Sequence, residues 1–283
     1  GDFGRRRAAG RQAGRGAQPV SAALPVRRVA KPWGRTSLPP PFDGPSDEAV
    51  GEIWFEPPPA LPQLLVKYIF TSQALSVQVH PSDHDAPGQG KEECWLVIAA
   101  EPGARFGIGL QAVIGPDALR AAALDGSIEG LLRWFPVEPG DFFHIPAGTV
   151  HAIGAGVSLI EVQQNSDTTY RLYDYGRPRD LHLDAGIAVA RAAPWDEGLH
   201  QRLAPLGPAR LVEGPAFRLD RIDDPRAPGL AARYGAGPLL VVPLAGEAVI
   251  GRERLLPGAC GLAPRLADLA LAGQALIAQP VIP

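Results

Sequence analysis

The sequence predicts a mostly β protein with a few helices, built from two β domains in tandem. Short apolar stretches recur along the 283 residues, and 33 glycines and 31 prolines lie between them without a fixed period. Frequent turn residues between short apolar stretches indicate many strands. Hydrophobic residues make up 46% of the chain, which suffices for the cores of one large or two modest domains.

Charge, apolar runs and cysteines exclude several classes of protein. The net charge of −3 is too small to predict a nucleic-acid or membrane partner. No apolar run reaches the roughly 18 residues of a membrane span. The two cysteines, Cys94 and Cys260, are fewer than a secreted disulfide framework usually contains, so we expect a reducing, cytoplasmic compartment.

Residues 1–22 are rich in Gly, Ala and Arg and show no apolar periodicity. They lack the apolar core of a secretory signal peptide, and we expect a disordered tail. An organelle-targeting segment is the alternative, because arginine is abundant there and only Asp2 is acidic.

The first domain is expected at 23–184. Within 74–80 apolar and polar residues alternate, which predicts a strand with Gln78 and His80 on one face. Residues 81–92, rich in Pro, Gly and Asp, predict a loop. A helical insert is expected at 116–134, starting at Pro116 and broken at Gly126. The other predicted strands are 64–70, 94–100, 142–145, 152–153, 158–163 and 170–173.

The remainder is predicted to be a helical linker, 185–207, and a second β domain, 208–283. Strand-like runs cover 239–244, 248–250 and 266–278, with a turn at Pro257 and Gly258. No histidine follows His200, so this domain lacks the commonest metal ligand, and we expect a structural role.

Four side chains on predicted strands or beside them form a candidate metal site: Gln78, His80, Glu93 and His151. Two imidazoles, a carboxylate and a carboxamide match the three or four protein ligands of a typical catalytic zinc site. With one carboxylate, the bound divalent ion would keep a charge of about +1 and act as a Lewis acid.

Chance placement of two histidines is the competing interpretation. His151 ends a Gly-x5-Pro-x-Gly-x2-His pattern beginning at Gly140, and a match at several positions favours the metal site. His84 and His144 are spare ligand candidates. Cys94 follows Glu93 directly, so it faces the opposite way, and we expect a buried thiol.

The pattern from Gly140 to His151 resembles the second motif of the cupin superfamily, although Ala155 stands where that motif has Asn. The first motif differs more, because Gln78-x-His80 replaces His-x-His and the glutamate, Glu93, follows thirteen residues later. These departures resemble the type I phosphomannose isomerases in their short bacterial form. The supporting segments are 31–34, 75–81, 90–95, 139–154 and 160–174, within a similarity that runs from about 24 to about 190.

The resemblance implies two jelly-roll domains, the second degenerate and without metal. It implies one zinc ion per chain on Gln78, His80, Glu93 and His151, a catalytic Arg171, and substrate-binding roles for Lys91 and Asp167. The implied reaction interconverts mannose 6-phosphate and fructose 6-phosphate through a cis-enediol and feeds mannose and GDP-mannose metabolism. The implied partner is the sugar phosphate, with the protein a monomer or homodimer.

Several points stay open at this stage. The general base is Lys91, Glu93, Asp167 or a zinc-bound water, and a Lys91 base would need a lowered pKa. Two other functions compete with the isomerase: an iron or manganese dioxygenase of the cupin class, and a sugar-phosphate sensor without catalysis. The cations available for the phosphate are Lys91, Arg105, Arg171, Arg177 and Arg179, and for Arg177 and Arg179 we favour solvated loop charges.

Overall fold

Three antiparallel sheets and four short α-helices make up the computed structural model, which describes residues 22–42, 44–235 and 237–281. The expectation of a mostly β chain with a few helices is confirmed. The expected tail at 1–22 lies outside the described residues, apart from Ala22. Within the described ranges, no helix has both the length and the apolar character needed to cross a bilayer.

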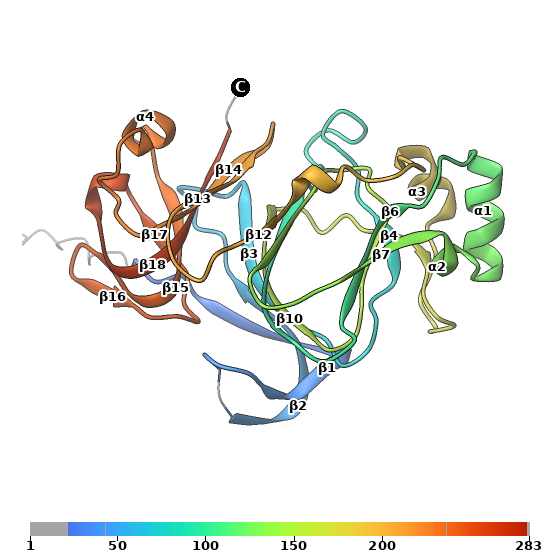
Figure 1. Cartoon of the computed structure of the whole chain (residues 1–283), viewed down its shortest axis with the longest axis horizontal. Helices are drawn as coiled ribbons and strands as arrows, with labels where there is room; N and C mark the ends of the chain where they lie inside the picture. Colours follow the sequence, from blue (N-terminus) through green and yellow to red (C-terminus); the bar gives the residue numbers. More distant parts are fainter. Residues whose placement is uncertain (1–21, 43, 236, 282–283) are drawn as a thin grey trace, which may run out of the picture.

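Two of the sheets face each other and form the first β sandwich (Figure 1). The larger sheet runs in the order β1 (Val26–Leu38), β2 (Gly44–Phe55), β3 (Leu64–Phe70), β10 (Val157–Gln164), β5 (Glu93–Ala100), β8 (Asp141–Ile145) and β12 (His200–Arg202). The smaller sheet runs β11 (Tyr170–Tyr173), β4 (Val77–Val79), β9 (His151–Ile153), β6 (Arg105–Leu110) and β7 (Leu132–Pro136). We call them the large and the small sheet.

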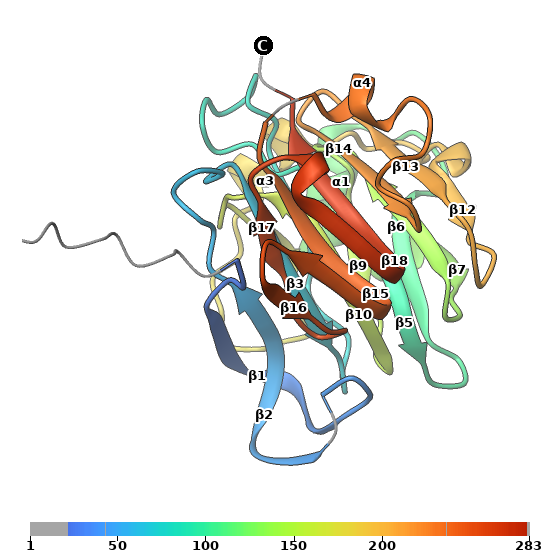
Figure 2. The ribbon, with the colours of Figure 1, turned by 90° about the vertical axis from the view of Figure 1, so that its left-hand side faces the viewer.

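The third sheet contains the C-terminal strands and packs against the other face of the large sheet (Figure 2). Its order is β13 (Ala209–Glu213), β14 (Phe217–Ile222), β18 (Leu269–Pro280), β15 (Leu239–Ile250) and β16 (Glu253–Leu255), with β17 (Gly261–Ala263) paired to β15. A 3-10 turn, η2 (Leu266–Asp268), and helix α4 (Leu230–Tyr234) complete this region. A degenerate second jelly roll here stays a prediction.

The large sheet is therefore buried on both faces. Strand β3 shows this best, because every one of its seven residues is buried. Ile69 belongs to the core shared with the small sheet, whereas Tyr68 belongs to the core shared with the third sheet. A strand buried on both faces is apolar throughout, and here a lysine, Lys67, interrupts it.

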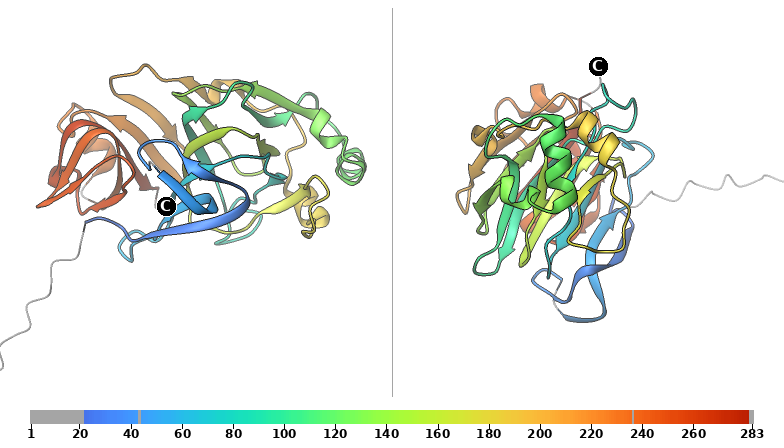
Figure 3. Two further views of the ribbon diagram at one scale, coloured as in Figure 1. Left: turned by 90° about the horizontal axis from the view of Figure 1, so that it is seen from below. Right: turned by 90° about the vertical axis from the view of Figure 1, so that its right-hand side faces the viewer.

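Helices cover the outer face of the small sheet (Figure 3). They are α1 (Pro116–Asp125), α2 (Ile128–Leu131) and α3 (Leu183–Val189). Gly126 ends α1 in the left-handed region, at φ 82°, as its position in the predicted insert suggests. Strand β7 begins directly after α2, so the last residues of the predicted insert are extended.

Some elements differ from the sequence-based expectations. The expected helical linker, 185–207, is α-helical only up to Val189, and then continues through the 3-10 turn η1 (Glu197–Leu199) into β12, which pairs with β8. Of the predicted strand at 74–80, only Val77–Val79 (β4) pair with neighbouring strands. Residues 74–76 and His80 lie outside the strand. The hairpin of β1 and β2 was not predicted, because much of both strands is exposed and gives no alternation.

Candidate metal centre

Three of the predicted site residues lie in one row across the small sheet. Arg171 on β11 pairs with Gln78 on β4, and Gln78 pairs with His151 on β9. Directly opposed residues in antiparallel strands place their side chains on the same face, close together. The register thus brings together residues up to 93 positions apart in the chain.

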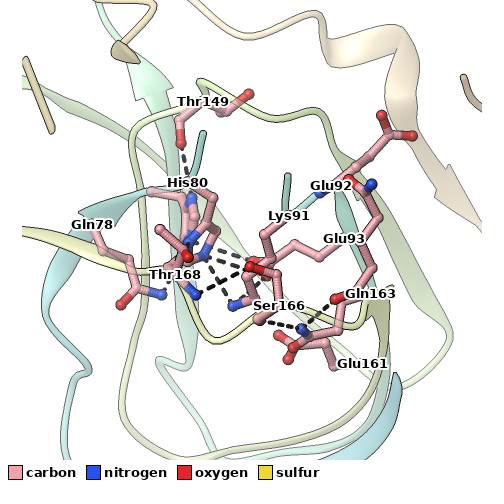
Figure 4. Close-up of polar contacts among 12 residues, drawn as sticks. Gln78, His80, Lys91, Glu92, Glu93, Thr149, Glu161, Gln163, Ser166 and Thr168 are labelled. Atoms are coloured by element: carbon pink, nitrogen blue, oxygen red, sulfur yellow. Dashed lines mark hydrogen bonds and ion pairs between the residues drawn. The ribbon is translucent and has the colours of Figure 1, made fainter. Parts of the chain in front are cut away.

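Glu93 approaches this row from the large sheet, where it opens β5. His80, Glu93 and His151 are all buried, and each offers one ligand atom within 4.8 Å of the others. Glu93 Oε2 lies 3.4 Å from His80 Nε2, and Glu93 Oε1 lies 3.3 Å from His151 Nε2. Figure 4 shows His80, Lys91 and Glu93 meeting at one point.

Both imidazoles present the nitrogen that a metal needs. His80 Nδ1 lies 2.9 Å from the carbonyl oxygen of Thr168, and His151 Nδ1 lies 2.9 Å from that of Thr149. A carbonyl only accepts, so each Nδ1 donates and each Nε2 keeps its lone pair toward Glu93. Burial lowers the pKa of both histidines, which favours the neutral imidazole that binds metals.

The turn before His151 depends on glycine. Gly148 has φ +85°, a conformation that side-chain-bearing residues rarely adopt, and its N–H donates to the carbonyl of His80 at 2.8 Å. A Cβ on Gly148 would also approach Val189 O to 3.1 Å. The Pro-x-Gly-x2-His pattern therefore fixes the His151 strand against the segment that ends in His80.

The donor set fits a divalent metal ion. Glu93 Oε2 is paired with Lys91 Nζ at 3.0 Å, whereas Glu93 Oε1 accepts no hydrogen bond from the described residues. Buried carboxylate oxygens normally accept several hydrogen bonds, and here the Nε2 atoms of His80 and His151 face them at 3.4 and 3.3 Å. A cation bound between them would satisfy the carboxylate and both Nε2 lone pairs together.

Gln78 supplies an amide at the same place. Its Nε2 is 3.2 Å from His151 Nε2, and its Oε1 accepts a hydrogen bond from Ser76 at 3.1 Å. Rotation of the amide by half a turn exchanges the two atoms and directs the oxygen toward the cluster. All four predicted ligands therefore lie together, with Gln78 able to offer the neutral oxygen.

Lys91 is buried beside the cluster, with Nζ 3.2 Å from His80 Nε2. Burial acts to lower its pKa, but the charges of Glu93 and Glu161 outweigh this, and the pKa is raised. The pair with Glu93 therefore favours the ammonium form of Lys91.

A cavity of about 460 Å³ opens beside the cluster, between the two sheets of the sandwich. Gln78, Lys91, Asp167 and Arg171 line it. Arg171 makes no ion pair with any described residue, and its Nη1 reaches only the carbonyl of Asp180, at 3.4 Å. Burial lowers the pKa of Arg171, yet a guanidinium stays charged at neutral pH. Asp167 is exposed at the cavity.

The large sheet contributes a second row to the cavity, which sequence reasoning missed. Trp95, Glu161 and Lys67 oppose one another on β5, β10 and β3. Glu161 accepts hydrogen bonds from Trp95 Nε1 at 3.0 Å and from Lys67 Nζ at 3.2 Å, and Lys67 lies over the Trp54 ring. The sequence does contain a signal for this row, because Lys67 and Glu161 are single charges inside otherwise apolar strands. Charged residues are rarely buried without a partner.

The other predicted cations lie elsewhere or are paired. Arg177 and Arg179 are half-buried and paired, and not solvated loop charges as expected, because both contact the buried Asp174, Arg179 through two hydrogen bonds of 2.6 and 2.7 Å. Arg179 still lines the cavity. Arg105 stacks on Trp134 at a distance from this cavity.

The spare histidines are outside the cluster. His84 is exposed in the loop, and His144 Nε2 lies 3.0 Å from Glu92 Oε1, on the face of the large sheet turned to the third sheet. Cys94 is a buried free thiol, as expected.

Known proteins support the resemblance drawn from the motifs. The chain is 40% identical to mannose-6-phosphate isomerase ManA of Bacillus subtilis (strain 168) over 172 residues, 56% of this chain and 54% of that protein. It is 45% identical to mannose-6-phosphate isomerase of Streptococcus mutans over 136 residues, 44% of this chain and 43% of that protein. The chain spans about half the length of these curated relatives. No model of a known protein family matches it.

Solved structures show the same fold. The crystal structure of mannose 6-phosphate isomerase from Bacillus subtilis superposes with a TM-score of 0.70 at 23% identity, covering 91% of this chain and 98% of that one. A zinc-bound mannose 6-phosphate isomerase gives 0.61 at 14% identity, covering 92% and 99%. The cupin-like fold of the phosphomannose isomerases is therefore present in this chain.

Proposed function

We propose that this chain is a zinc-dependent isomerase that interconverts mannose 6-phosphate and fructose 6-phosphate. The buried His80–Glu93–His151 cluster, which lies behind a cavity lined by Gln78, Lys91 and Arg171, is the observation that carries the proposal. Gln78, His80, Glu93 and His151 would hold one zinc ion per chain. When bound, the zinc would act as a Lewis acid for the negative charge that builds on the sugar oxygens. A zinc-bound neighbour of the same fold supports this choice of metal.

The reaction moves a proton between C1 and C2 through a cis-enediol, so it needs a general base. Three carboxylates outside the cluster line the cavity: Glu52, Glu161 and Asp167. Glu52 lies on β2, which β3 and β10 separate from β5, the strand that Glu93 opens, so it is farther from the cluster along the large sheet than Glu161 on β10. The Glu161 carboxylate is held by Trp95 and Lys67, whereas Asp167 is exposed and makes no such contacts. A base must keep a fixed position relative to the proton it takes, and Glu161 meets that condition better. We therefore assign the proton transfer to Glu161.

Charge on the developing enediolate needs a donor that is not already engaged. Arg171 meets this condition, because it has no carboxylate partner in the described part of the chain and is the strand neighbour of Gln78. Its guanidinium can donate two parallel hydrogen bonds to an anionic oxygen pair. The buried ammonium of Lys91 adds positive charge on the same side and would bind the sugar phosphate, as would Asp167 through sugar hydroxyls.

A coupled assay with mannose 6-phosphate tests the proposal. We expect turnover that a chelator abolishes and that zinc restores, with no uptake of oxygen. Oxygen consumption with iron or manganese would instead identify a dioxygenase. Binding of mannose 6-phosphate by zinc-loaded protein without any turnover would identify a sensor. The cytoplasmic location, the monomeric or dimeric state and the supply of GDP-mannose stay predictions.

A further inference from the structure

A second cavity lies on the reverse face of the large sheet, between that sheet and the third sheet. It measures about 560 Å³, and we call it the interlayer pocket. Tyr68 and Ile160 line it, and they pair with each other directly behind the row that Lys67 and Glu161 form on the front face. Alternation along β3 and β10 thus separates the two cavities by one thickness of sheet.

The interlayer pocket contains a buried arginine without a carboxylate. Arg221, on β14, is 6% exposed, and no described residue forms an ion pair with it. Its Nη1 donates to the carbonyl of Ala204 at 2.8 Å, but its Nε has no partner. Burial lowers the pKa of Arg221, although the nearby charge of Asp223 acts the other way. An uncompensated buried cation is costly, so it is rare unless something binds it.

A buried amide stands near the arginine. Gln274, on β18, is 7% exposed and also lines the interlayer pocket. Arg221 pairs with Leu276, and Gln274 lies two residues from Leu276, so both polar side chains belong to the face turned toward the large sheet. Leu219 and Leu276 on that face belong to the core between the layers. The guanidinium of Arg221 and the carboxamide of Gln274 therefore lie at the edge of this apolar core, where it borders the interlayer pocket.

We propose that the interlayer pocket binds a small organic monocarboxylate with an apolar body. The carboxylate would meet the free donors of Arg221 and the amide of Gln274, since a guanidinium fork matches a carboxylate. The apolar body would lie against Tyr68, Ile160 and Leu244, which line the rest of the pocket. One cation and mostly apolar walls suit a monoanion better than a dianionic sugar phosphate.

Hexanoate, with hexan-1-ol as the uncharged probe of similar length, tests this site by calorimetry and ligand-detected NMR on the full chain. The Arg221→Gln variant removes the cation. The Ala245→Trp variant fills the pocket from an exposed lining residue, so it spares the buried core. Arg226→Gln is the matched control, because Arg226 has an 89% exposed side chain in the same region.

We expect hexanoate to bind the unchanged protein and the Arg226→Gln control alike. Affinity should fall about ten-fold or more in Arg221→Gln and in Ala245→Trp, and hexan-1-ol should bind at least about ten-fold more weakly than hexanoate. The proposal would be overturned by any of three results: hexanoate fails to bind at a 20-fold or greater molar excess over the protein, hexan-1-ol binds as tightly as hexanoate, or either pocket variant binds hexanoate with unchanged affinity. Isomerase activity is not a readout here, so failure of the proposed function leaves this test intact.

Discussion

Two buried clusters of charged groups, one in each half of the chain, differ in how completely their carboxylates are hydrogen-bonded. In the C-terminal half, Asp220 Oδ2 accepts hydrogen bonds from Arg233 Nε and from the Tyr234 hydroxyl, each at 2.5 Å. Arg233 also donates to the Val212 carbonyl at 2.7 Å. In the first half, Glu93 Oε1 accepts no hydrogen bond from the described residues, and Oε2 is paired only with the Lys91 ammonium, at 3.0 Å.

The difference separates structural from functional burial. A buried charge with all its partners holds neighbouring elements together, here β13, β14 and α4. A buried carboxylate that keeps one oxygen without a donor and faces two imidazole nitrogens is completed by a bound cation. Burial alone therefore does not distinguish a structural charge from a functional one. The distinction comes from whether polar atoms of the buried group lack a hydrogen-bond partner.

Removal of a proposed ligand should have the largest effect. In His151→Gln we expect turnover of mannose 6-phosphate to fall about 1,000-fold, because one of the two imidazoles is lost. The free energy of unfolding of the chelator-treated protein should fall by less than about 2 kcal/mol, since His151 gives up two neutral hydrogen bonds, with Thr149 and Gln78. Metal analysis, the coupled assay and urea unfolding measure these quantities. Full metal content in this variant would contradict the ligand assignment.

The matched change in the other cluster should act on stability instead. Asp220→Asn removes the buried carboxylate from Arg233, which keeps an ion pair with Glu213, whose side chain is 59% exposed, so we expect the free energy of unfolding to fall by about 2 kcal/mol. Turnover per folded molecule should stay as it was. Urea unfolding and the coupled assay, applied to the same preparation, test both halves of the comparison, and a loss of turnover without a loss of stability would invalidate it.

Arg171 is the intermediate case, because it lines the cavity without an ion pair to any described residue. In Arg171→Ala we expect zinc content to be unchanged and turnover to fall about 100-fold, through loss of a donor to the developing negative charge. Arg105→Ala is the control, since Arg105 lies away from the cavity. Equal turnover in the two variants would remove Arg171 from the catalytic assignment.

An exposed ion pair should have the smallest effect. Arg265 Nη2 lies 2.8 Å from Asp268 Oδ1, with 60% and 29% of the two side chains exposed. In Arg265→Gln the free energy of unfolding should change by less than about 0.5 kcal/mol, because solvent screens such pairs. A thermal melt measures this change. A loss of stability as large as that of Asp220→Asn would mean that an exposed ion pair stabilises the fold as much as a buried one does.

The sequence alone predicted the members of the metal cluster because their signals are local. Alternation in 74–80 places Gln78 and His80 on one face, and the glycines before His151 form a recognisable turn. Glu161 and Lys67 were missed because their partners are each other, 94 residues apart, and only the register of β3 and β10 reveals the pair. His144 was kept as a spare ligand because alternation along β8 does not tell which face of the strand is turned to the cavity. Only the packing of the sheets settles that.

The row of Arg171, Gln78 and His151 has a consequence for how such a chain can change in length. Strand β4 has three residues, and loss of one would turn Gln78 to the other face of the small sheet and end the row. The tip of the loop after His80 has open space: although the φ of +72° at Gly88 favours glycine, a Cβ there would meet nothing within 4 Å. Insertions at that tip would lengthen the interval between His80 and Glu93 and leave both side chains in place. The interval along the chain can therefore drift over evolutionary time, whereas the strand pairing that sets the geometry cannot.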